Sequence, residues 1–368
     1  MTVFSRTDRS ILGQWWWTVD RAMLAGFAVL ALFGVVMVLA SSPGIARTLR
    51  LSSEGFFIVR HLVFLVPATC LLLAASLLAP RGVLRLAVAM LAVFGAMLLS
   101  TLLFAPEIKG SHRWIFPFGL QVQPSEFVKP ALAVVTAWLL ARFEGLAGLP
   151  EALLAVGAVV LVLVLQPDLG MTVLTLAVFA AQLFVAGLGW FWIAGLAGMA
   201  VAGLLGAYAL FPHVQARIDD FVDPTTEVYQ VEKAMDAVAS GGLFGKGPGE
   251  GQVKFTLPEA HSDFVFATAV EEYGALACLA VVAVFATIVL RGLVRVQACE
   301  DRFVQLAGAG LVVQLGLQAI INMAVNLNLM PTKGMTLPFI SYGGSSMLAL
   351  AFGMGMLLAL TRRGARLR

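Results

Sequence analysis

Charged side chains are scarce in this 368-residue chain, and their scarcity excludes an ordinary soluble domain. Only 12% of the residues are Asp, Glu, Lys or Arg, whereas soluble domains hold about 25%. Hydrophobic residues make up 60% of the chain, and its mean hydropathy is +0.93. Apolar runs of about 20 residues, the length that a helix needs to cross a bilayer, recur along the whole sequence. The composition therefore indicates an all-α, polytopic membrane protein with one integral domain.

Cysteine is almost absent, which excludes a disulfide framework and a cysteine-based zinc site. The three cysteines are too few and too widely spaced for either. Cys70 and Cys278 lie within apolar runs and are expected to be small core residues. The first apolar run is long enough to span a bilayer and follows a polar leader, so we expect a retained helix rather than a cleaved signal peptide.

Ten apolar runs predict about ten transmembrane helices with both termini in the cytoplasm. The runs are 22–41, 57–79, 84–105, 126–143, 150–166, 169–188, 190–211, 264–290, 303–325 and 345–361. With this orientation, thirteen Lys and Arg residues lie on the inner side and five in the short outer loops, as the positive-inside rule requires. The predicted parts are a cytoplasmic leader 1–21, a membrane domain 22–361 and a basic cytoplasmic tail 362–368.

The long polar stretch 212–263, between helices 7 and 8, is expected to be a large periplasmic loop. It carries nine acidic residues against four basic ones. Its glycine-rich segment 240–249 superficially resembles a phosphate loop, but it lacks the first glycine and the Ser or Thr of the Walker pattern. We therefore expect a turned loop there, and we place the chemistry of the protein in 212–263 or in the cleft beneath it.

Asp263, at the start of the eighth predicted helix, is the leading catalytic candidate. One interpretation is a helix cap, because an acid before an apolar run satisfies free N–H groups and favours the helix dipole. The other is a general base at the membrane surface, with Phe255, Phe264 and Phe266 partly desolvating its carboxylate. The sequence leaves both roles open.

Charged residues inside the predicted helices are further candidates. Glu271 and Glu272 are costly in a bilayer, so they are either functional or part of a buried ion pair. Glu126 and Lys129, spaced i,i+3, can pair on one helix face, and Ser125 before them is a candidate cap. Lys129 could instead join Arg113 as a cation for a phosphate-bearing ligand.

Other polar residues within the apolar runs have a structural and a functional interpretation. Asp168 is either the cap of the sixth helix or part of a polar cavity. Arg60 and His61 are expected to extend outward to water, although Arg60 could instead point into a shared cleft. The loop 330–346 is expected to be an ordered re-entrant turn. A polar stripe in the ninth helix predicts interhelical hydrogen bonds or a wet groove. That stripe consists of Gln314, Gln318 and Asn322.

Several of these blocks together resemble one family, the SEDS proteins (FtsW/RodA/SpoVE). The resemblance covers about residues 20 to 361, and the 336–342 stretch is more similar to the cell-division type than to the elongation type. The matching blocks are Lys109–Trp114, Gln123–Lys129, Gln166–Gly170, Leu257–Phe264 with Glu271–Gly274, and Leu337–Ser346. Ser262 departs from the family pattern, in which Thr is commoner.

The resemblance implies a peptidoglycan glycosyltransferase that polymerises lipid II, an undecaprenyl-diphosphate-linked disaccharide-pentapeptide, during septal cell-wall synthesis in cell division. The family's essential acid corresponds to Asp263, which would act as the general base. Four functionally sensitive family positions correspond to Arg113, Glu126, Lys129 and Asp168. The other residues expected to contact the substrate are Lys246, Lys254, His261, Glu271 and Ser341.

The resemblance also implies partners and a place in the cell. It predicts a multi-pass protein of the bacterial inner membrane at the division septum, working with a class B penicillin-binding transpeptidase and other divisome proteins, and no nucleic-acid partner. No cofactor is implied, although a divalent cation, Mg²⁺ or Mn²⁺, could stabilise the departing diphosphate. Three alternatives remain open: a lipid II flippase, an elongation-type polymerase and a scaffold that leaves catalysis to its partners.

Overall fold

The computed structural model describes residues 10–48, 53, 55–107, 111–143, 145–210, 215, 219, 229–331 and 334–362. Much of the predicted loop before Tyr229, residues 1–9 of the leader and residues 363–368 of the tail lie outside the described residues. Apart from one isolated bridge between Ile115 and Val122, the described residues form helices, turns and loops.

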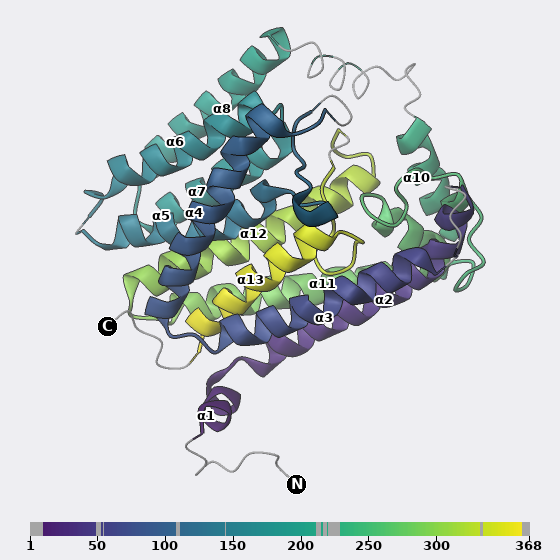
Figure 1. Cartoon of the computed structure of the whole chain (residues 1–368), viewed down its shortest axis with the longest axis horizontal. Helices are drawn as coiled ribbons and strands as arrows, with labels where there is room; N and C mark the ends of the chain where they lie inside the picture. The colour runs from purple at the N-terminus through teal and green to yellow at the C-terminus, as the bar shows by residue number, and fades with distance from the viewer. Residues whose placement is uncertain are drawn as a thin grey trace.

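Each of the ten predicted spans is confirmed as a helix (Figure 1). They are α2 (Arg21–Thr48), α3 (Phe56–Ser76), α4 (Pro80–Phe104), α5 (Pro124–Ala141), α6 (Leu149–Leu165), α7 (Leu169–Val185), α8 (Trp190–Leu210), α11 (Val265–Gln297), α12 (Arg302–Asn326) and α13 (Gly344–Leu360). Among the described residues, α2, α3, α4, α11 and α12 are long and apolar enough to cross a membrane, and α6, α7, α8 and α13 are shorter apolar helices. The chain is a multi-pass, all-α membrane protein.

In the part of the chain that the structure describes, four short elements lie outside these ten helices. They are α1 (Ile11–Thr18), α10 (Tyr229–Gly241) and the 3₁₀ turns η1 (Pro117–Gly119) and η2 (Val253–Phe255). The helix α1 lies in the predicted leader, where no helix was expected. In contrast, α10 and η2 give the described part of the outer loop a helical framework.

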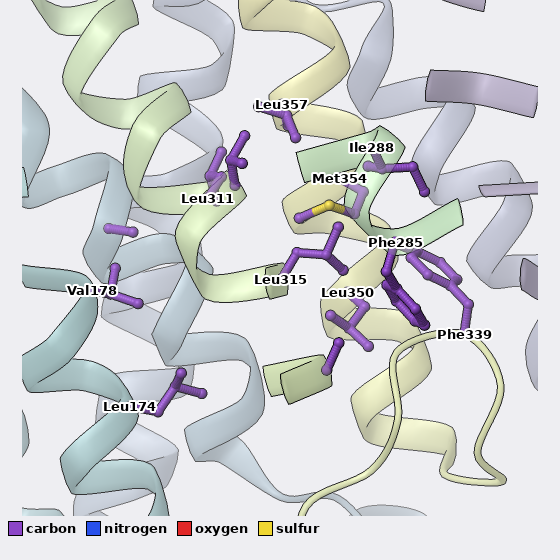
Figure 2. Close-up of a cluster of buried hydrophobic side chains, with 14 of the residues drawn as sticks. Leu174, Val178, Phe285, Ile288, Leu311, Leu315, Phe339, Leu350, Met354 and Leu357 are labelled. Carbon is purple, nitrogen blue, oxygen red and sulfur yellow. The ribbon is translucent and has the colours of Figure 1, made fainter. Parts of the chain in front are cut away.

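The helices α5, α12 and α13 form the centre of the bundle, and most of their side chains are buried. Leucines of α12 and α13 pack there against α7 and α11 (Figure 2). Glycine permits the close approach of these helices, as is common in membrane bundles. A Cβ on Gly310 would lie 2.6 Å from Nε2 of Gln182, and one on Gly355 would lie 2.6 Å from the carbonyl oxygen of Leu72.

The surrounding helices expose apolar side chains on their outer faces, as lipid contact requires. Cys70 of α3 is exposed on this surface, so the prediction that it belongs to the core is wrong. The helical register turns it away from α13. Cys278 of α11 is buried, as predicted.

Different contacts and elements mark the inner and the outer end of the bundle. At the inner end, Asp20 is paired with Arg291, and Arg302 donates a hydrogen bond to the carbonyl oxygen of Gly145 at 2.6 Å. The opposite, outer end carries Asp263, and α10 lies at this end (Figure 1). The loops that the positive-inside rule assigns to the cytoplasmic side therefore lie together at one end of the molecule.

Candidate active site

Asp263 lies in a tight turn directly before α11, and its side chain is partly exposed. The helix begins at Val265, its N-cap is Phe264, and no side chain caps that position. The helix-cap interpretation of Asp263 is therefore wrong, because the turn ends one residue later than the sequence indicated. A Cβ on Gly334 would lie 3.4 Å from Oδ2 of Asp263, so the carboxylate faces the loop between α12 and α13.

Two asparagines of α12 hold the backbone of Asp263. The side-chain amides of Asn322 and Asn326 donate hydrogen bonds of 2.9 and 2.8 Å to its carbonyl oxygen. Asn326 also accepts a hydrogen bond of 2.9 Å from the backbone N–H of Ala267, within the first turn of α11. The polar stripe thus forms interhelical hydrogen bonds that position the backbone of the candidate base. Asn326 extends the stripe by one more i,i+4 step.

The loop before α13 holds the same turn from the other side. Ser341 donates a hydrogen bond of 2.5 Å from its hydroxyl to the carbonyl oxygen of Ser262. The backbone N–H of Tyr342 donates one of 2.8 Å to the carbonyl oxygen of His261. Ser341 therefore positions the turn, and its hydroxyl also accepts from the N–H of Leu337 at 2.8 Å.

Glu126 and Lys129 form the predicted i,i+3 ion pair, with an N–O distance of 3.0 Å. Their side chains are 6% and 4% exposed, so the pair is buried between helices. Lys129 also donates a hydrogen bond of 3.3 Å to Oε1 of Gln318, whose amide donates to the carbonyl oxygen of Thr336 at 3.2 Å. Ser125 is not the cap of α5, because the helix begins at Pro124 with Gln123 as its N-cap.

A small internal cavity lies beside Lys129, between α5, α6, α7 and α12. Its volume is about 10 Å³, close to the space that one water molecule needs. Thr175 Oγ1 and Gln314 Oε1 belong to its lining, and neither has a hydrogen-bond partner among the described residues. The polar groups in this mostly apolar lining suit a water that would complete the hydrogen bonds of both side chains.

Arg113, from the loop before α5, and Asp168, from the turn before α7, are brought together at the outer end. Nε of Arg113 lies 3.6 Å from Oδ2 of Asp168, and its Nη2 donates a hydrogen bond of 2.6 Å to the carbonyl oxygen of Pro167. Asp168 is also the N-cap of α7 and accepts from the backbone N–H of Met171 at 3.3 Å. Of the two interpretations of Asp168, the helix cap is confirmed, and Arg113 lies beside the capping carboxylate.

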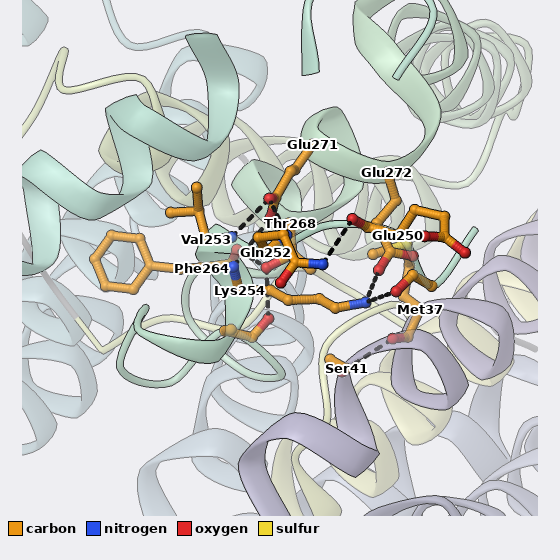
Figure 3. A network of polar contacts seen from close by, with 12 residues as sticks. Met37, Ser41, Glu250, Gln252, Val253, Lys254, Phe264, Thr268, Glu271 and Glu272 are labelled. Atoms are coloured by element: carbon orange, nitrogen blue, oxygen red, sulfur yellow. Dashed lines mark hydrogen bonds and ion pairs between the residues drawn. The ribbon is translucent and has the colours of Figure 1, made fainter. Parts of the chain in front are cut away.

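Glu271, Glu272 and Lys254 form a buried network between α11 and η2 (Figure 3). The carboxylate of Glu271 accepts hydrogen bonds of 2.7, 2.7 and 3.0 Å from the backbone N–H groups of Gln252, Val253 and Lys254. Lys254 is ion-paired with Glu272. Both glutamates therefore fix the outer loop onto α11.

This network does not fit two of the predicted substrate contacts. Lys254 is 2% exposed and Glu271 is 0% exposed, and both have protein partners. The sequence could not show this, because the partners are 17 to 19 positions apart. Lys246, in contrast, is exposed on the outer loop and accessible to a ligand.

His261 packs in an aromatic cluster below the turn. Its ring centroid lies 4.6 Å from that of Phe57 and 5.3 Å from that of Tyr342. Burial lowers the pKa of His261 to about 4, against a smaller opposite effect of Glu259, so the ring is neutral at pH 7. His61 of α3 is fully buried beside Tyr342, so the prediction that it points to water is wrong, whereas Arg60 is exposed.

No group of three or more His, Cys, Asp or Glu side chains that could hold a metal ion is present among the described residues.

Comparisons with known proteins agree with this architecture. A family model described as cell cycle protein FtsW/RodA/SpoVE matches residues 20–365. The chain belongs to the FtsW/RodA/SpoVE family. A probable peptidoglycan glycosyltransferase FtsW of Caulobacter vibrioides is 44% identical over 98% of this chain and 93% of that protein. One of Halomonas elongata is 36% identical over 92% of this chain and 89% of that protein.

Solved structures of this family share the fold. One is described as a peptidoglycan synthase complex that coordinates polymerization and crosslinking; a chain of it is 26% identical, with a TM-score of 0.76 over 93% of this chain and 97% of that chain. The Thermus thermophilus rod shape determining protein RodA is also 26% identical, with a TM-score of 0.69 over 94% of this chain and 97% of its own. Within the FtsW/RodA/SpoVE family, the curated relatives named here are FtsW proteins, in agreement with the division-type resemblance.

Proposed function

We propose that this FtsW-type chain is a peptidoglycan glycosyltransferase that polymerises lipid II at the outer face of the inner membrane, with Asp263 as the general base. The observation that carries the proposal is a partly exposed carboxylate on a turn whose backbone is held by the asparagines of α12 and by the loop before α13, directly before α11. Such support preorganises a catalytic group. The relatives named as peptidoglycan glycosyltransferases agree with this reaction.

The proposed reaction is a single displacement. Asp263 accepts the proton of the acceptor sugar hydroxyl, and the hydroxyl oxygen forms a bond to the anomeric carbon of the donor. The bond from that carbon to the diphosphate breaks, and the lipid diphosphate departs with the electron pair. An α-linked donor then gives a β-1,4-linked product, so no protein nucleophile is needed.

Basic groups at the outer end would stabilise the charge that develops on the diphosphate. We assign this role to Arg113 and Lys246, because Lys129 and Lys254 are buried and already paired with Glu126 and Glu272. A divalent cation would have to reach the site with the diphosphate, since Mg²⁺ is commonly held by one or two carboxylates together with substrate phosphates. No step of the proposed reaction passes through it.

We place the reaction at the division septum, beside a class B penicillin-binding transpeptidase and other divisome proteins. The name of the FtsW relatives supports the division role, and the solved synthase complex supports a partnership between polymerisation and crosslinking. A flippase remains the rival, since a multi-pass membrane protein also suits transport, but a flippase does not need a fixed carboxylate at the turn before α11.

The decisive experiment gives the purified chain, alone and with the transpeptidase, fluorescent lipid II in lipid nanodiscs. We expect glycan polymer from the wild-type protein and none from Asp263→Asn, which keeps the size of the side chain. Asp236→Asn, the same change on an exposed acid of α10, is the matched control and should retain activity. Polymer from Asp263→Asn, or lipid II translocation without polymer from the wild type, would refute the proposal.

A further inference from the structure

The outer loop of the protein enters a break in α11. Gly274 has φ 82° and ψ 167°, which interrupts the helix two and a half turns after its start. Residues 241–247 fill the break. The N–H groups of Lys246 and Gly247 donate hydrogen bonds of 2.9 Å to the carbonyl oxygens of Glu271 and Glu272.

The same segment also accepts hydrogen bonds from the second half of α11. The carbonyl oxygens of Gly242 and Leu243 accept from the N–H groups of Ala275 and Leu276 at 2.9 and 3.2 Å. The backbone groups released by the break therefore find partners within the protein, as any backbone at membrane depth must.

Two glycines allow the backbone of this segment to approach the backbone of α11 closely. A Cβ on Gly245 would lie 2.3 Å from the carbonyl oxygen of Glu272, and one on Gly274 would lie 2.3 Å from that of Leu243. Gly245 also has a positive φ of 77°. The two backbones are in direct contact, so the segment is packed into the break of α11 and does not merely lie over the helix.

Two large apolar side chains project from this segment. Leu243 is 61% exposed and Phe244 is 81% exposed. On the adjoining part of α11, Leu276 and Leu279 are 50% and 61% exposed. The four side chains belong to two segments that are joined by backbone hydrogen bonds. The leucines of α11 lie on the outer surface of a membrane-spanning helix.

The position along α11 places these side chains inside the bilayer. Arg291 is tied to Asp20 at the inner end, and the hydrocarbon of a bilayer takes about 20 helical residues. Counting back from Arg291, the outer boundary lies at about residue 271, so Leu276 is roughly 7 Å below it. This is the depth of about 5–10 Å that interfacial apolar side chains reach.

We infer that Leu243 and Phe244 insert into the outer leaflet and contact lipid acyl chains, which makes residues 241–247 a membrane-embedded wedge of the outer loop. Lipid is the occupant because the wedge continues the lipid-facing surface of α11 at acyl-chain depth. The exposed Lys246 follows at the level of Glu271, where its ammonium group can reach lipid phosphates.

The wedge sets the height of η2 above the bilayer. Glu271, beside the break, also binds the backbone of Gln252–Lys254, so a continuous chain of hydrogen bonds joins the wedge to η2. The inference does not depend on glycosyl transfer, because it concerns only the surroundings of two side chains.

Spin labels on the full chain in nanodiscs test the inference. In a background with Cys70→Ser, Cys278→Ala and Cys299→Ser, a nitroxide is attached to Phe244→Cys, to the lipid-facing reference Leu279→Cys or to the water-facing reference Glu250→Cys. Accessibility to oxygen, which concentrates in lipid, is compared with accessibility to a water-soluble nickel complex.

We expect the label at 244 to match that at 279, with a higher oxygen and a lower nickel accessibility than at 250. A label at 244 that behaves like the label at 250 would overturn the inference. Low accessibility to both reagents would overturn it as well, because another protein surface would then cover the wedge. Each variant is compared with its unlabelled parent by thermal unfolding, so a misfolded protein is not scored.

Discussion

Arg291, near the end of α11, donates hydrogen bonds of 2.7 and 2.9 Å from its Nε to the carboxylate of Asp20, which lies 271 positions earlier in the chain. Arg295 adds a third at 2.8 Å. Asp20 also accepts from the backbone N–H groups of Ala22 and Met23, both at 3.1 Å. One carboxylate thus starts α2 and attaches it to the inner end of α11.

Asp20→Asn should destabilise the protein by about 1–2 kcal/mol, because hydrogen bonds to a charged group are lost and the arginines are partly exposed. Burial by itself would raise the pKa of Asp20, but Arg291, Arg295 and the N–H of Met23 hold the pKa below its ordinary value of 3.8. The contribution of Asp20 is therefore complete above about pH 4 and is lost as the pH falls further. Thermal unfolding in detergent measures it, and equal unfolding temperatures for both proteins would contradict the prediction.

Lys254→Met should cost about 3–5 kcal/mol of stability, because it leaves Glu272 buried without its partner. Adding Glu272→Gln should restore most of the loss. Lys233→Met, which removes a more exposed ion pair of α10, should cost less than about 1 kcal/mol. If Lys254 were needed only for substrate, Lys254→Met would leave the unfolding temperature unchanged.

His261→Gln should make the protein less sensitive to acid. Because burial lowers the pKa of His261 to about 4 from 6.5, the unfolded chain binds a proton between these values that the folded protein excludes. Stability therefore falls as the pH falls from about 6.5 to about 4, by roughly 3 kcal/mol in total. Unfolding temperatures of the two proteins at pH 7, 5.5 and 4.5 measure the difference, and identical pH dependences would refute it.

Gly274→Ala should destabilise the protein strongly. Its backbone conformation alone costs a residue with a side chain about 1–3 kcal/mol, and the new methyl group would lie 2.3 Å from the carbonyl oxygen of Leu243. Gly95→Ala is the matched control, because Gly95 lies in α4 with nothing within 4 Å of the added Cβ. Thermal unfolding should show a loss for the first variant and no loss for the second, and similar effects of both would show that the break is not required.

Local sequence patterns determined much of this protein. Apolar runs predicted all ten helices, because a helix that crosses lipid must be apolar for about 20 residues. The i,i+3 spacing of Glu126 and Lys129 predicted their ion pair, and the place of Asp168 before an apolar run predicted its cap. Each of these features depends on residues that are neighbours in the chain.

Only the tertiary structure decided which distant groups meet. Asn326 holds the carbonyl oxygen of Asp263 across 63 positions, and Arg113 reaches Pro167 across 54. His61 faces inward because α3 presents that side to the loop carrying Tyr342, and a period of 3.6 residues cannot say which helix will cover a face. The insertion of 241–247 into α11 has no periodic signal either, because it depends on backbone groups that every residue carries.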